Sequence, residues 1–146
     1  MYVSTEWPYL GASPDATVTC ECCGSGVLEV KCPYSLKDGL PEVLPHDSFL
    51  EMRSGKVTLK HNHAYYYQVQ MQLTVCQASY CDFIVWTTSS LNVERIQQDT
   101  MFFQEKLEAV QRFFVYGVLP EIIGKWYTRK PVANSEGVVL DPNHLL

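Results

Sequence analysis

The chain has 146 residues, 47% of them hydrophobic, which is enough for one domain with a sizeable core, and no change in composition calls for a second domain. Its net charge of −5 argues against a protein that coats nucleic acid by bulk electrostatics, because such binding depends on neutralising phosphates. No apolar run is long enough to span a bilayer and the amino terminus lacks a secretory signal, so we expect an intracellular protein that is neither membrane-bound nor secreted, and nuclear if its source is eukaryotic.

The first predicted elements are two strands, over residues 17–20 and 27–32, joined by a turn at Gly24-Ser25-Gly26. Asp15 lies just before the first strand and Glu29 lies within the second, so antiparallel pairing brings their side chains together. Side chains alternate along a strand, and Glu29 and Lys31 therefore project from the same face. The hairpin is expected to gather two carboxylates and an amine.

The next stretch, residues 33–60, is rich in proline, glycine and charge, and it is predicted to be a long loop with one short helix near residues 48–53. A longer helix then begins at His61 or Asn62 and runs to about residue 77. Its apolar stripe, which we expect to pack in the core, consists of Tyr65, Val69, Leu73 and Cys76. Gln68 lies off this stripe and is expected to face the sheet edge that carries the charged residues. The adjacent tyrosines are interpreted as packing groups, with stacking on bases as the alternative.

Two further strands are predicted after this helix, a buried one over residues 81–87 and a second over residues 91–96. A helix then begins at Asp99. Its apolar face, which is expected to lie on the sheet, recurs at helical spacing through Phe103, Leu107, Val110 and Phe114. The pattern weakens after Pro120, and we expect one domain over residues 1–130 followed by a carboxyl-terminal tail over residues 131–146.

The residues that carry chemistry are Asp15, Glu29 and Lys31, which form an Asp…Glu-x-Lys pattern. Two carboxylates can hold Mg²⁺ or Mn²⁺ through oxygen ligands, and a neighbouring amine can orient a water that attacks a phosphodiester. The pattern is short and common by chance, so its surroundings decide how much weight it has.

Three motifs surround it in one order and with compact spacing: Tyr-Leu-Gly-Ala-Ser-Pro-Asp at 9–15, Gly-Val-Leu-Glu-Val-Lys-Cys-Pro-Tyr-Ser at 26–35, and Tyr-Tyr-Tyr-Gln-Val-Gln-Met-Gln at 65–72. Together they resemble the YqaJ-like viral recombinase family, the relatives of phage lambda exonuclease within the PD-(D/E)XK nuclease superfamily. The resemblance covers about residues 7–120. It implies a restriction-endonuclease-like α/β fold, with a mixed central sheet flanked by helices. It also implies a metal-dependent exonuclease that acts on the free ends of duplex DNA in recombination or DNA processing, and a homo-oligomer such as a trimeric ring.

Residue by residue, the resemblance makes Asp15 and Glu29 metal ligands, together with the carbonyl of Val30. Lys31 would position the attacking water and Gln68 would support it. The residues that would contact nucleic acid are Ser13, Ser35, Tyr66 and Gln70.

The sequence departs from the family pattern in two places. Ala16 stands where the family usually has glycine, so we expect a slightly altered turn after Asp15. The family also carries an acidic residue on a helix upstream of the Ser-Pro-Asp motif, and this chain starts too late to include it. The second departure motivates an alternative function, a catalytically inactive or truncated nuclease-derived module that binds nucleic acid without cleaving it.

Three of the six cysteines, Cys20, Cys22 and Cys23, crowd the end of the predicted hairpin. Thiolates bind Zn²⁺ well, but a structural zinc site normally has four ligands, and a fourth is not evident from the spacing. The other interpretation is a group of reduced, partly buried thiols. A small zinc-stabilised interaction domain is therefore a third functional hypothesis. Disulfides are disfavoured because the chain has no secretory signal.

Overall fold

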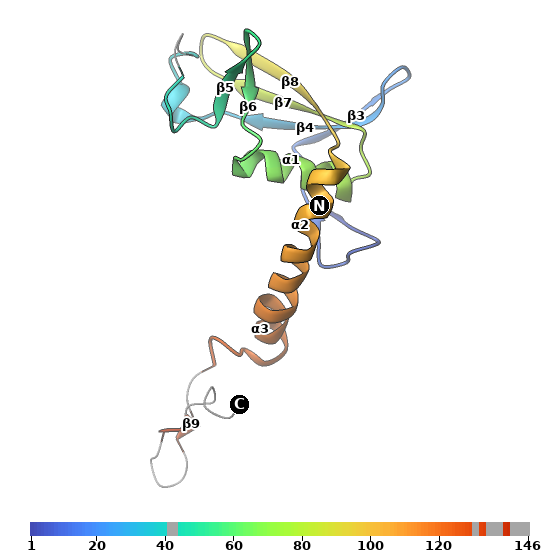
Figure 1. Cartoon of the computed structure of the whole chain (residues 1–146), viewed down its shortest axis with the longest axis vertical. Coiled ribbons are helices and arrows are strands. Elements are labelled where there is room, and N and C mark those ends of the chain that lie inside the picture. The colour runs from blue at the N-terminus through green and yellow to red at the C-terminus, as the bar shows by residue number, and fades with distance from the viewer. Residues whose placement is uncertain (41–43, 130–131, 134–138, 141–146) are drawn as a thin grey trace. The chain divides into compact units, whose positions relative to one another are not determined.

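The structure is a computed structural model that describes residues 1–40, 44–129, 132–133 and 139–140. The chain forms two compact units, Met1–Phe103 and Gln104–Leu146, and each is treated by itself below. The first unit is built on a four-stranded sheet in the order β3-β4-β7-β8 (Figure 1). Its strands are Ala16–Cys20, Gly24–Lys31, Tyr80–Trp86 and Leu91–Gln97. The sheet is mixed, because β4 and β7 are parallel whereas the outer pairs are antiparallel.

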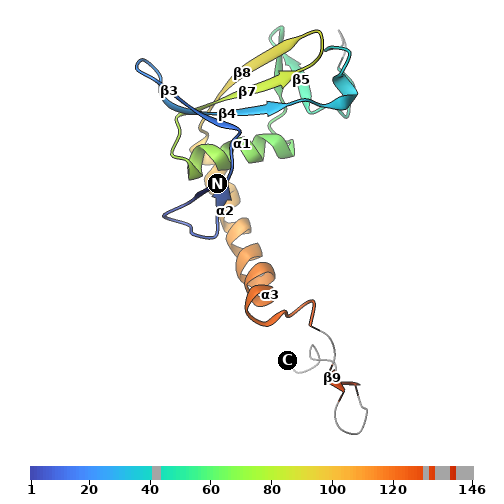
Figure 2. The same cartoon turned by 180° about the vertical axis from the view of Figure 1, so that it is seen from behind.

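Helix α1 (Ala64–Val75) lies along one face of this sheet, as Figure 2 also shows from behind. It begins after His63, whose imidazole Nδ1 accepts a hydrogen bond from the amide of Tyr65 and so satisfies a free donor of the first turn. Val69 and Leu73 are completely buried, as the predicted stripe requires. The core between α1 and the sheet also contains Val27, Leu36, Leu50, Leu59, Tyr66, Ala78, Cys81, Phe83, Val85 and Ile96.

The predicted helix near residues 48–53 is wrong, because this segment is a strand. β5 (Leu50–Arg53) pairs with β6 (Lys56–Leu59) in an antiparallel hairpin. Ser54 and Gly55 form the turn with φ of 52° and 76°, the pair of positive angles that a two-residue type I′ turn needs. Leu50 and Leu59 face each other across the hairpin and are each 1% exposed, so tertiary burial stabilises the strand over the helix.

The remaining elements of the first unit are short. At the amino terminus β1 (Tyr2–Val3) pairs with β2 (Gly11–Ala12), and a single 3-10 turn, η1 (Tyr34–Leu36), follows β4. The predicted strands in β3, β4, β7 and β8 and the helix α1 are all confirmed within a few residues. The chain therefore has the mixed α/β architecture of a restriction-endonuclease-like fold, as the sequence predicted.

Helix α2 (Thr100–Phe113) runs from the first unit into the second and is followed by a π-helical segment, η2 (Phe114–Val118), and by α3 (Leu119–Gly124). Of the stripe expected in the core, only Phe103 is buried, whereas Leu107, Val110 and Phe114 are partly exposed. Phe103, which belongs to the first unit, is thus in the core as predicted, whereas the other three residues belong to the second unit.

The predicted tail over residues 131–146 lies largely outside the described residues. Within it, β9 (Val132–Ala133) pairs with β10 (Val139–Leu140). In the part of the chain that the structure describes, no helix is both long enough and apolar enough to cross a membrane.

Candidate active site

Glu29 is the centre of the site. It lies on the face of β4 that α1 covers and is 3% exposed. Its Oε1 accepts hydrogen bonds from Lys31 Nζ at 2.5 Å and Gln68 Nε2 at 2.7 Å, and its Oε2 accepts one from Gln72 Nε2 at 2.7 Å. Burial of a charged group is costly unless the charge is paired and hydrogen-bonded. Three donors meet this requirement and hold the carboxylate in one orientation.

Lys31 follows two residues later on the same face. Besides its ion pair with Glu29, its Nζ donates a hydrogen bond to Gln68 Oε1 at 3.1 Å and lies 4.4 Å from the centroid of the Tyr65 ring. The Gln68 amide therefore bridges the pair, because its oxygen accepts from the amine while its nitrogen donates to the acid. The ammonium group is held between a carboxylate, an amide and an aromatic face.

Asp15 approaches the same strand along its edge. Its amide donates a hydrogen bond to the Leu28 carbonyl at 3.0 Å, and its Oδ2 accepts one from the Val30 amide at 2.7 Å. The N–H and C=O groups of one strand residue point to the same edge, so the Val30 carbonyl also faces the Asp15 side. The pairing of β3 with β4 ends at Ala16 and Leu28, so among the described residues no strand pairs with Val30 at this edge.

Ala16 itself is an ordinary strand residue. Its φ is not among the positive values that the described non-glycine residues adopt, so the replacement of the family's usual glycine places no strain on the backbone here. The backbone is therefore unstrained at Ala16, where we expected a slightly altered turn.

The donor set fits a divalent cation. Carboxylate and carbonyl oxygens are the ligands that Mg²⁺ and Mn²⁺ prefer, and they come together here from Asp15, Glu29 and Val30. A carboxylate offers about four acceptor positions, and the three donors on Glu29 leave about one for a metal. Lys31 balances the charge of Glu29, whereas Asp15 forms no ion pair with any residue that the structure describes.

Two residues of this network were not predicted. Gln72 is 2% exposed and binds Glu29, and its Oε1 is buried without a hydrogen-bond partner among the described residues. Tyr65, which the sequence assigned to the core, also contacts Lys31. Residues 65, 68 and 72 are spaced i, i+3 and i+7 and so share one face of α1, but this spacing alone does not say that the face meets β4.

The other predicted contacts with nucleic acid fall into two pairs. Ser13 and Ser35 are exposed. Tyr66 is 3% exposed and stacks on the His61 ring at 4.1 Å between centroids. Gln70 is 1% exposed, and its amide is occupied by the Gln97 carbonyl and the Asp99 amide. Tyr66 and Gln70 are therefore buried packing residues here, and the Gln70 amide joins α1 to the segment between β8 and α2.

The three predicted thiols, Cys20, Cys22 and Cys23, lie together at the tip of the β3–β4 hairpin, with every pair of sulfurs within 4.8 Å. Hydrogen bonds from the Cys22 thiol and from the turn backbone lower the pKa of Cys20 to about 7, and the same contact raises the pKa of Cys22. All six cysteines of the chain are free thiols.

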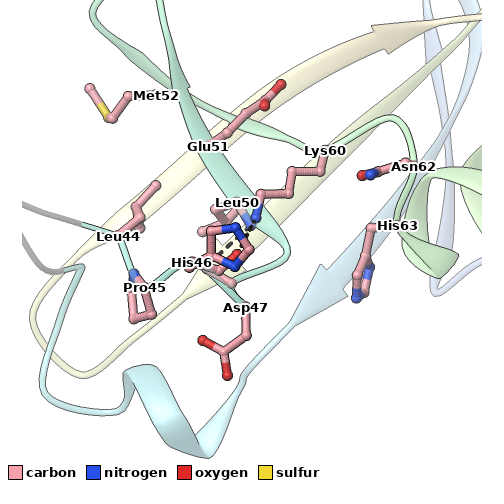
Figure 3. Close-up of a pocket in the computed structure, with 11 residues that line it drawn as sticks. Leu44, Pro45, His46, Asp47, Leu50, Glu51, Met52, Lys60, Asn62 and His63 are labelled. Carbon is pink, nitrogen blue, oxygen red and sulfur yellow. Dashed lines mark hydrogen bonds between the residues drawn. The ribbon is translucent and has the colours of Figure 1, made fainter.

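A groove of about 800 Å³ lies along the β5–β6 hairpin (Figure 3). Its lining is of mixed charge, with Lys60, His46, Asp47 and Glu51, and Lys60 Nζ donates a hydrogen bond to the His46 carbonyl at 2.8 Å. His63, which also lines the groove, packs at 4.7 Å against the Tyr65 ring that contacts the lysine of the site. The groove therefore adjoins the Glu29 network.

Comparison with protein families gives a match over the part of the chain that carries the site. The family model described as YqaJ-like viral recombinase domain matches residues 1–79, which is just over half of the chain and contains every residue of the network. No curated protein and no solved structure matches the chain. The family is nuclease-like; nucleases of this kind generally use divalent metals, and a recombinase-like nuclease implies DNA as the substrate.

Proposed function

Because the chain belongs to the family of the YqaJ-like viral recombinase domain, we propose that it is a metal-dependent deoxyribonuclease that degrades duplex DNA from a free end. The observation that carries the proposal is the buried Glu29 carboxylate, which hydrogen bonds from Lys31 and Gln68 hold in place. The Asp15 carboxylate binds the backbone of the same strand at Val30. A purely structural ion pair would not need an exposed carboxylate and an unpaired strand edge next to it.

Asp15, Glu29 and the Val30 carbonyl would hold Mg²⁺ or Mn²⁺. When bound, such an ion lowers the pKa of its water and stabilises negative charge on the phosphate oxygens. The protein's share is positional: Lys31 donates a hydrogen bond to the attacking water oxygen, and Gln68 keeps the amine and the Glu29 carboxylate in fixed relation. Gln72 fixes the second carboxylate oxygen, so the acid has little freedom to turn away.

The groove along the β5–β6 hairpin would receive the part of the DNA that extends beyond the site. It is adjacent to the network through His63 and Tyr65, and Lys60 and Asn62 supply donors for phosphate oxygens. Phosphate contacts position a nucleic acid without reading its sequence, as an enzyme acting on any DNA end requires.

The test is degradation of end-labelled linear duplex DNA with Mg²⁺ or Mn²⁺, with EDTA as the metal-free control. Wild type is compared with Lys31→Ala and with Lys56→Ala, a matched variant that removes an exposed lysine of β6 outside the network. We expect metal-dependent loss of label that Lys31→Ala abolishes and Lys56→Ala keeps.

A covalently closed circle of the same sequence tests the need for an end. Equal cleavage of circle and linear DNA would refute the exonuclease assignment while keeping the nuclease. Absence of cleavage with metal binding retained would favour the alternative function, a nuclease-derived module that binds nucleic acid. Cleavage that persists in EDTA or in Lys31→Ala would overturn the proposed mechanism.

A further inference from the structure

The tip of the β3–β4 hairpin carries a group of side chains that the proposed nuclease does not use. Sγ of Cys22 lies 3.0 Å from that of Cys20 and 3.3 Å from that of Cys23. We propose that these three thiols form a three-thiolate site for Zn²⁺, separate from the divalent-metal site at Glu29.

The sulfur positions suit such an ion. With Zn–S bonds of about 2.3 Å, tetrahedral geometry places sulfurs roughly 3.8 Å apart. The three sulfurs lie within 4.8 Å of one another, and two of the separations are shorter than the tetrahedral value. The separations therefore lie within about 1 Å of the spacing that a tetrahedral zinc ion needs.

The hairpin holds the thiols together before any ion arrives. Cys20 is paired with Gly24, so only residues 21–23 form the loop. Gly24 has a φ of +77°, a left-handed conformation that closes a three-residue hairpin loop and that other residues rarely adopt. A site assembled by a short, fixed loop loses little conformational entropy when it binds.

A guanidinium group, itself paired with a carboxylate, lies beside the cluster. Three thiolates on Zn²⁺ leave one net negative charge, and Arg95 Nη1 lies 3.5 Å from Cys23 Sγ. Two hydrogen bonds of 2.8 Å to Asp82 and a ring contact of 3.9 Å with Tyr80 fix this guanidinium. A positioned cation next to the sulfurs stabilises the deprotonated, metal-bound form.

The site is exposed and independent of the nuclease centre. Cys22 and Cys23 are both exposed, so water or an atom of another molecule can take the fourth position. Three protein ligands and an open fourth position are the arrangement of a zinc ion that exchanges ligands. Gly24 and Glu29 are five residues apart on β4, or about 16 Å at a rise of roughly 3.3 Å per residue, so two ions would not share ligands.

The experiment uses the full chain, reduced and freed of metal, and titrated with Zn²⁺ and separately with Co²⁺. Bound zinc is counted by elemental analysis, and thiolate coordination is read from the sulfur-to-cobalt charge-transfer absorbance, which an oxygen site cannot give. The variants are Cys22→Ser and, as a matched control, Cys32→Ser, which removes an exposed thiol outside the cluster.

We expect one Zn²⁺ per chain and a cobalt–thiolate band, with affinity at least tenfold weaker in Cys22→Ser and unchanged in Cys32→Ser. Circular dichroism checks that both variants fold. Absence of the cobalt–thiolate band in the wild type, or an equal band in Cys22→Ser, would overturn the proposal. Neither result depends on DNA cleavage, so the zinc site and the nuclease stand or fall separately.

Discussion

Removal of the charge of either Glu29 or Lys31 tests whether the two form a buried, energetically coupled pair. Their side chains are 4% and 17% exposed and 2.5 Å apart. Lys31→Met leaves a buried carboxylate with amide donors alone, and loss of one partner of a buried pair costs about 3–5 kcal/mol. Glu29→Gln costs less, about 1–3 kcal/mol, because the more exposed Lys31 amine can reach water.

The double variant Glu29→Gln/Lys31→Met removes both charges and leaves a neutral network of glutamine amides. We expect it to be more stable than the sum of the single variants predicts, by a coupling energy of about 2–3 kcal/mol, which falls in the range for charged groups in contact. The magnitude follows from burial, because an exposed pair would contribute only about 0.2–1 kcal/mol.

The measurement is urea-induced unfolding followed by circular dichroism, in EDTA so that metal binding does not enter the free energy. A cycle with Glu51→Gln and Arg53→Met, an exposed ion pair of the β5–β6 hairpin, is the matched control and should show little coupling. If the Glu29 and Lys31 effects add to within about 0.5 kcal/mol, the coupled network does not exist in solution.

Three other predictions address the metal ligand, the DNA surface and the thiols. Asp15→Asn should weaken Mg²⁺ binding at least tenfold in calorimetry while the midpoint of thermal unfolding stays nearly constant, because the side chain is exposed; unchanged Mg²⁺ affinity would remove Asp15 from the ligand set. Lys60→Ala should weaken duplex DNA binding in fluorescence anisotropy, because its amine lines the groove that is proposed to receive DNA; equal affinity would exclude it as a contact. In metal-free protein at pH 7, Cys20 should react with iodoacetamide well before Cys81, because its pKa is lowered to about 7 and about half of it is thiolate, whereas burial raises the pKa of Cys81 to about 12. Mass spectrometry of the modified peptides gives the order, and faster reaction of Cys81 would contradict it.

The elements that the sequence predicted correctly are those whose signal is local. Strands β4 and β7 are runs of apolar and β-branched residues, and α1 has a clear stripe through Val69 and Leu73. Such patterns show that a segment has an apolar face to bury. They can therefore be recognised without knowing which element packs against that face.

The β5–β6 hairpin was missed for the opposite reason. Leu50, Glu51, Met52 and Arg53 include good helix formers, and intrinsic propensity favours a helix there. The strand is decided by the turn at Ser54 and Gly55 and by burial of Leu50 against the distant core, which is a tertiary effect that overrides propensity.

In the candidate site, too, the residues placed by local rules were predicted and a residue placed by tertiary packing was not. The sequence placed Glu29 and Lys31 on one face because alternation in a strand is a local rule, and it placed Gln68 toward them because that residue lies off the apolar stripe. Gln72 could not be assigned without the crossing of α1 over β4, since a glutamine within a helix reads as a solvated surface residue.

Assembly of the site and packing of α1 on the sheet are therefore the same event. The donors on Glu29 that come from Gln68 and Gln72 reach it only when Val69 and Leu73, on adjoining positions of the helix, are buried against the sheet. Each hydrogen bond to the charged carboxylate contributes about 1.5–3 kcal/mol, and without the helix the buried charge would be left with Lys31 alone. The acid that would bind the metal thus depends for its orientation on the same helix that closes the hydrophobic core.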